Sequence, residues 1–117
     1  MNTLKKVLVV DDSESFQRFL KNVLSRRGII VLSALTIGEA EKLFSANPDV
    51  SLIAMDACVP GDRPNTFSLV QKIRQTYAGP MIACSSLKEY RRLLIEAGCD
   101  REASKLDLPK VIKEILE

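Results

Sequence analysis

Two hydrophobic periodicities alternate along the chain. Short runs rich in Val and Ile suit strands buried on both faces, whereas apolar residues three or four positions apart suit helices with one buried face. The runs predict strands at residues 4–10, 29–32, 50–55 and 81–84, and position alone predicts a fifth at 100–104. Five strand–helix units of this length predict an α/β domain, with helices on both faces of a parallel sheet.

Several helix ends are marked by residues that satisfy free backbone groups. Capping-box signatures predict the starts of two helices: Thr36 with Glu39, and Ser86 with Glu89. Thr66 is expected to cap the third helix, directly after a long loop at residues 57–65.

Composition narrows the class of protein. The chain has 117 residues, which predicts one domain over residues 1–117, and 46% hydrophobic with 27% charged residues is typical of a globular protein. A net charge of +2 is too small for a nucleic-acid-binding surface, so we expect no direct DNA binding. No apolar run could cross a membrane, and no signal peptide is evident. With no His at all, Ser-His-Asp catalysis and most zinc sites are excluded.

The cysteines indicate a reducing environment. Cys58, Cys84 and Cys99 are odd in number and lack a CxxC spacing, which predicts reduced thiols in the cytoplasm. Cys84 and Cys99 are interpreted as small buried hydrophobes. Cys58 lies in the long loop, so for this residue a reactive thiol stays an open interpretation.

Polar residues follow four of the five predicted strands. Asp11 and Asp12 follow the first strand, Asp56 the third, Ser85 the fourth and Lys105 the fifth. Because ligands of open parallel sheets bind beyond the carboxyl ends of the strands, we expect these side chains to share one site.

The chemistry of this set favours phosphoryl transfer. Three carboxylates at one edge repel each other unless a cation is present, and Mg²⁺ prefers such oxygen ligands. A carboxylate nucleophile, a divalent cation, a hydroxyl and a lysine together suit that reaction. Each residue also has a plainer interpretation, since Asp12 or Ser13 could cap the first helix and Lys105 could be solvated. Their joint occurrence favours the site.

Four stretches of the sequence resemble the receiver domain of bacterial two-component response regulators. They are VLVVDDSES, LIAMDACVPG, PMIACSS, and Lys105 following AGCDREAS. The resemblance implies a flavodoxin-like doubly wound sheet of five parallel strands with five helices, (βα)5. It also implies a stand-alone receiver, similar to those of chemotaxis, that accepts phosphate from a sensor histidine kinase or histidine phosphotransfer protein.

Residue roles follow from the same resemblance. Asp56 corresponds to the phospho-accepting aspartate, and Asp11 and Asp12 to the acidic pair that binds Mg²⁺. Cys58 would contribute its backbone carbonyl to the metal. Ser85 and Lys105 would contact the phosphoryl group. Turnover of a separate substrate is not expected, and signalling would use the face formed by the fourth helix, fifth strand and fifth helix.

Three positions depart from the family pattern. Glu102 stands where many receivers have an aromatic residue, Leu106 replaces the usual proline after Lys105, and the loop at 60–66 is about two residues longer. A buried carboxylate without a partner is costly, so we expect Glu102 to face solvent, paired if at all with Arg101 or a basic residue of the fourth helix. The Lys105–Leu106 peptide is expected to be trans. Activation would then involve Ser85 and the loop before the fourth helix.

Other interpretations of the sequence fit less well. A phosphorylation-independent interaction module stays open, although the complete set of chemical residues argues against it. Phosphatases of the haloacid-dehalogenase type carry a DxD motif after the first strand. This chain has the adjacent pair Asp11-Asp12 at that place, so it lacks the DxD spacing. Two adjacent aspartates would also repel a flavodoxin-like phosphate group. The GxGxxG and GxxxxGK[ST] motifs are absent.

Overall fold

The computed structural model describes residues 4–61 and 63–117, and it confirms the predicted alternation of strands and helices. Residue 62 of the predicted loop and residues 1–3 of the predicted domain lie outside the described residues. The elements are β1 (Lys5–Val10), α1 (Glu14–Ser25), β2 (Ile29–Ala34), α2 (Ile37–Ala46), β3 (Leu52–Met55), α3 (Phe67–Arg74), β4 (Met81–Ala83), α4 (Lys88–Ala97), β5 (Arg101–Glu102) and α5 (Leu108–Leu116).

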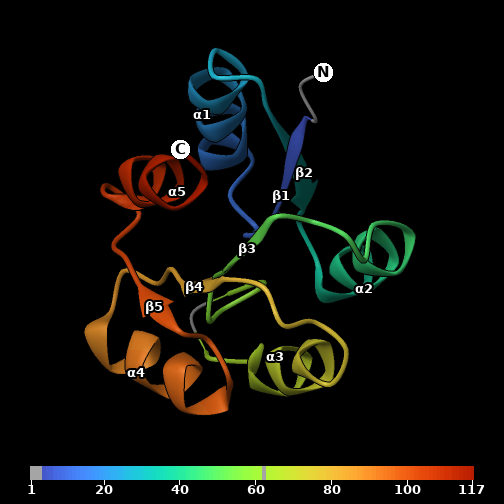
Figure 1. The fold of residues 1–117 in the computed structure, drawn as a ribbon. Helices are drawn as coiled ribbons and strands as arrows, with labels where there is room; N and C mark the ends of the chain where they lie inside the picture. The colour runs from blue at the N-terminus through green and yellow to red at the C-terminus, as the bar shows by residue number, and fades with distance from the viewer. Residues whose placement is uncertain (1–3, 62) are drawn as a thin grey trace.

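The strands form one parallel sheet in the order β2-β1-β3-β4-β5 (Figure 1). This is the flavodoxin-like order, in which β2 is added on one side of β1 and β3 on the other, so the predicted fold class is confirmed. The switch point therefore lies where β1 and β3 end side by side. Among the described residues, no helix is long and apolar enough to cross a membrane.

Two hydrophobic layers pack against the sheet, one on each face. Helices α1 and α5 cover one face, and α2, α3 and α4 cover the other (Figure 1). Successive residues of β1 alternate between the layers, with Val7 and Val9 in the first and Leu8 and Val10 in the second. Burial on both faces explains the continuous apolar runs of the sequence.

The fifth strand pairs with β4 over only two residues, so it is shorter than predicted. Arg101 aligns with Ile82 and Glu102 with Ala83, and both β5 side chains are exposed. An exposed edge strand lacks the hydrophobic run that marks the other strands, which is why position alone located it.

The predicted helix caps differ in outcome. At α2 the Thr36 hydroxyl accepts from the Glu39 amide at 3.0 Å, as predicted, while the Glu39 carboxylate accepts from the Leu35 amide at 2.7 Å. The capping box of Ser86 with Glu89 is wrong, because α4 begins after Leu87, which makes no side-chain cap.

Thr66 precedes α3 but does not cap it. Its hydroxyl donates instead to the backbone carbonyls of Asp56, at 2.7 Å, and Ala57, at 3.2 Å. The hydroxyl is thereby used to hold the end of β3, and Thr66 is completely buried there.

Helix α1 also departs from its apolar pattern. Phe19, which the spacing places on the apolar face, is 52% exposed, whereas Gln17 is 4% exposed. The Gln17 amide nitrogen donates to the backbone oxygens of Val9, Asp11 and Ala34 at 2.9–3.3 Å. These bonds satisfy the amide nitrogen of Gln17 where β1 and β2 end, whereas its buried Oε1 has no hydrogen-bond partner among the described residues.

Gly98 ends α4 in a place where a side chain has no room. Its φ of +144° is one that other residues rarely adopt, and an added Cβ would lie 2.7 Å from Cγ of Arg74. Arg74 cannot easily give way, since it donates to the carbonyls of Gly98, Tyr77 and Gly79 and forms an ion pair with Asp100.

We therefore predict that Gly98→Ala lowers the free energy of unfolding by roughly 1 kcal/mol or more. The matched control is Gly38→Ala in α2, where the nearest atom to the new Cβ is Thr36 Oγ1 at 3.9 Å. That variant should leave stability unchanged or raise it by up to about 1 kcal/mol. Urea denaturation measures both, and equal losses would contradict the prediction.

Candidate functional site

Backbone hydrogen bonds bring the predicted site residues to one edge of the sheet. The amide of Asp11 donates to the Ala34 carbonyl at 3.0 Å, and the amide of Asp56 donates to the Val10 carbonyl at 2.9 Å. Each carboxylate thus follows the last paired residue of its strand. Asp12, Asp56, Cys58, Ser85 and Lys105 line one pocket of about 230 Å³ at this edge, and Asp11 adjoins it.

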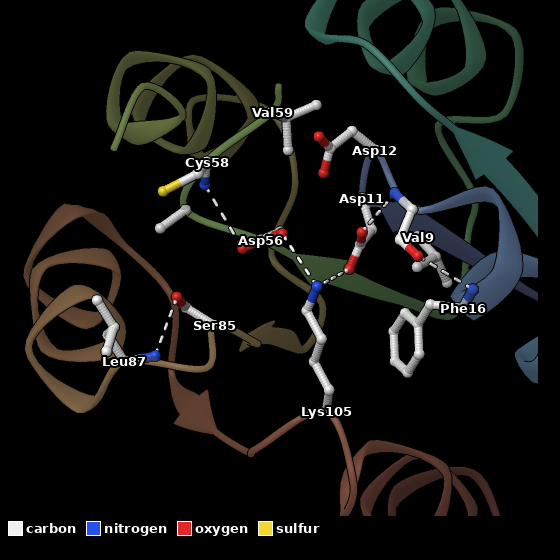
Figure 2. Close-up of polar contacts among 12 residues, drawn as sticks. Val9, Asp11, Asp12, Phe16, Asp56, Cys58, Val59, Ser85, Leu87 and Lys105 are labelled. Atoms are coloured by element: carbon white, nitrogen blue, oxygen red, sulfur yellow. Dashed lines mark hydrogen bonds and ion pairs between the residues drawn. The ribbon is translucent and has the colours of Figure 1, made fainter. Parts of the chain in front are cut away.

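Three carboxylates form the acidic part of the site. One oxygen each from Asp11, Asp12 and Asp56 lies within 4.8 Å of the others (Figure 2). Asp11 and Asp56 are buried, and Asp12 is more exposed. The Ser13 amide donates to Asp11 Oδ1 at 2.9 Å, and the Gly61 amide contacts Asp12 Oδ2 at 3.4 Å. Ser13 also caps α1, since its hydroxyl accepts from the Phe16 amide.

Lys105 connects the C-terminal part of the chain to both buried carboxylates. Its Nζ lies 3.0 Å from Asp11 Oδ2 and 3.5 Å from Asp56 Oδ2 (Figure 2). Burial tends to lower the pKa of Lys105, but its hydrogen bond and attraction to Asp11, with the charge of Asp56, leave that pKa raised. The ammonium also lies 5.3 Å from the centre of the Phe16 ring, within range of a cation–π contact.

One lysine does not balance this charge. Burial, followed by repulsion from Asp11, raises the pKa of Asp56 despite the opposing effect of Lys105. A divalent cation would relieve that repulsion, and clustered carboxylate oxygens are the ligands that Mg²⁺ and Ca²⁺ prefer. The residues present therefore fit a hard divalent cation. The Mg²⁺ roles of Asp11, Asp12 and Asp56, and the carbonyl role of Cys58, stay predictions.

The three cysteines are all buried, and no disulfide joins them. Burial raises the pKa of Cys84 and of Cys99 to about 12, so both are protonated at neutral pH, as expected of small core residues. The Cys58 amide lies 3.5 Å from Asp56 Oδ1, which places this residue against the central carboxylate.

Ser85 is buried beside the pocket, but its hydroxyl is turned toward the start of α4. Its Oγ accepts from the Leu87 amide at 3.4 Å (Figure 2). Its carbonyl accepts a shorter bond, of 2.7 Å, from Nη1 of Arg91. Sequence reasoning did not foresee the contact of Arg91 with Ser85, and it also missed the site-supporting roles of Gln17, Thr66 and Phe16.

Two of the three unusual positions, Glu102 and Leu106, behave as predicted in this structure. Glu102 is exposed, and its Oε1 pairs with Nε of Arg91, a basic residue of α4, at 3.0 Å. Among the described residues the one cis peptide is Val59–Pro60, so the Lys105–Leu106 peptide is trans. Leu106 is 89% exposed.

Comparisons with known proteins identify relatives of this chain. The model of a family described as response regulator receiver domain matches residues 7–116. Chemotaxis protein CheY1 of Helicobacter pylori is 35% identical over 118 residues, covering 96% of this chain and 94% of that protein.

Solved structures agree with the fold. A response regulator from Burkholderia pseudomallei, described with a phosphorylated aspartic acid, a calcium ion and citrate, has a TM-score of 0.82 and 25% identity, over 97% of this chain and 66% of that one. A CheY-like receiver domain protein from Methanospirillum hungatei has a TM-score of 0.78 and 26% identity, over 96% and 93% of the two chains.

The repulsion at the site predicts that Asp56→Asn raises the free energy of unfolding at pH 7 in chelator-treated buffer. The amide removes a buried charge whose ionisation is opposed by burial and by Asp11. Asp107→Asn, at an exposed position without a side-chain cap, is the control and should change little. Urea denaturation provides the comparison, and a destabilised Asp56→Asn protein would contradict the prediction.

Proposed function

The chain belongs to the response regulator receiver family, and from this membership we propose that it accepts a phosphoryl group on Asp56. The observation that carries the proposal is the position of Asp56, which lies in the acidic cluster, 3.5 Å from Lys105 and in the same pocket as Ser85. An acceptor needs a nucleophilic oxygen next to groups that can balance the charge of phosphate, and these neighbours supply them.

In the proposed step a carboxylate oxygen of Asp56 attacks the phosphorus of a phospho-histidine. The oxygen–phosphorus bond forms, the phosphorus–nitrogen bond breaks, and the imidazole leaves with the electron pair and takes up a proton. Lys105, already 3.5 Å from Asp56, would pair with a phosphoryl oxygen. The hydroxyl of Ser85 would donate to a second one after turning away from Leu87.

A divalent cation, which we propose is Mg²⁺, would be held by Asp11, Asp12 and Asp56, with the backbone carbonyl of Cys58 as a further ligand. When bound, it neutralises negative charge that develops on the phosphoryl oxygens. Asp11 and Asp12 would position the cation relative to Asp56, since their own carboxylates accept from the Ser13 and Gly61 amides.

The partner class follows from the chemistry of the donor. A sensor histidine kinase or a histidine phosphotransfer protein would supply the phosphoryl group, and we place the reaction in the cytoplasm, where buried reduced thiols are stable. Reaction at Asp56 alone, with no turnover of a separate substrate, is part of this proposal, as is the absence of direct DNA binding at a net charge of +2. The interaction-module and phosphatase alternatives are not favoured by family membership.

Treatment with acetyl phosphate and Mg²⁺ tests the acceptor directly. We expect intact-mass measurement to show one added phosphoryl group, lost on Asp56→Asn, because that amide is not a nucleophile of comparable strength. Asp107→Asn should retain the full label. A fully labelled Asp56→Asn protein would exclude Asp56 as the acceptor.

The metal set predicts that Asp12→Ala weakens Mg²⁺ binding by about tenfold or more, because one of three carboxylates is lost from the site. Isothermal titration with MgCl₂ measures this effect. Asp107→Ala is the control, since it removes an equally charged, exposed carboxylate that is not part of the acidic cluster. Unchanged affinity in Asp12→Ala would exclude this residue from the metal site.

A further inference from the structure

One guanidinium joins the turn after β4 to the edge strand β5. Nη1 of Arg91 donates to the carbonyl of Ser85 at 2.7 Å, and Nε of the same side chain donates to Oε1 of Glu102 at 3.0 Å. The Arg91 side chain is only 16% exposed, whereas that of Glu102 is 40% exposed, so the contact with Ser85 is the better shielded of the two. Ser85 is therefore anchored through its backbone to a strand it does not belong to.

The two polar groups of Ser85 are held with very different strength. Its carbonyl takes a short bond from a charged donor, whereas its hydroxyl accepts from the Leu87 amide at 3.4 Å, near the limit of a hydrogen bond. Turning the hydroxyl sacrifices only the weak contact. Moving the backbone of Ser85 would break the strong one and disturb the ion pair behind it.

We propose that Arg91 is a positioning residue for the phosphoryl site. Oriented by Glu102, it fixes the backbone of Ser85, so that the Ser85 hydroxyl reaches a phosphoryl oxygen on Asp56 by rotation about its Cα–Cβ bond alone. This inference rests on the proposed function, and it gives the unusual Glu102 a role through Arg91.

The two contacts of Arg91 depend on the forked, planar shape of its guanidinium group. The carbonyl of Ser85 and the carboxylate of Glu102 are engaged by two different nitrogens of one planar group. A lysine has a single ammonium and cannot reproduce both bonds in that arrangement. Arg91→Lys keeps the charge and most of the stem, so its defect would report on the fork rather than on net charge.

The experiment measures the affinity for beryllofluoride, a phosphoryl mimic, in the presence of Mg²⁺, by titration calorimetry. We expect Arg91→Gln to weaken this affinity about tenfold and Arg91→Lys to weaken it several-fold. Arg92→Gln, at the next and exposed position of α4, is the matched control and should bind as the original chain does. Mg²⁺ affinity measured without beryllofluoride should stay unchanged in all three, which also shows that the fold is intact.

A double-mutant cycle distinguishes positioning from general destabilisation. If Arg91 acts through the Ser85 hydroxyl, then adding Arg91→Gln to a Ser85→Ala protein should cause no further loss of beryllofluoride affinity. Equal losses in both backgrounds, or an Arg91→Gln protein that binds as well as the original chain, would overturn the inference while leaving the proposed function standing. Absence of binding by the original chain would overturn the proposed function itself, and this inference with it.

Discussion

Two carboxylates buried side by side at the end of a parallel sheet impose the main constraint on this structure. Asp11 and Asp56 are fixed there by the hydrogen bonds of the strands that precede them, so neither can withdraw from the other. Among the described residues, Lys105 is the one cation that forms an ion pair with both. A group with unrelieved negative charge is well suited to attract a cation, and the same crowding that costs stability favours function.

Polar anchors away from the reacting atoms keep this edge in shape. Gln17 binds the carbonyls where β1 and β2 end, and Thr66 binds those where β3 ends. Arg91 likewise binds the carbonyl of Ser85, just after β4 ends. Each anchor is a side chain that donates to backbone carbonyls where a strand ends, which adds hydrogen bonds at the edge of the sheet that carries the site.

Much of the fold and of the site could be predicted because both depend on local patterns. The apolar runs of β1 and β3 located Asp11, Asp12 and Asp56 at strand ends, and parallel topology brought them together. The anchors could not be predicted this way. Gln17 and Thr66 resemble ordinary helix and cap residues in sequence, and only the carbonyls they meet in the folded chain give them their role. Phe19 and Ser86 were assigned from helical spacing and capping patterns, which tertiary contacts overrode.

The ion pair between Lys105 and Asp11 joins residues that are synthesised at very different times. Asp11 follows the first strand to be synthesised, and Lys105 precedes the last helix. A ribosome-bound chain that still lacks its C-terminal unit would have both buried carboxylates without this lysine. Formation of the site therefore coincides with completion of the domain, and a nascent fragment lacks the lysine that offsets part of its negative charge.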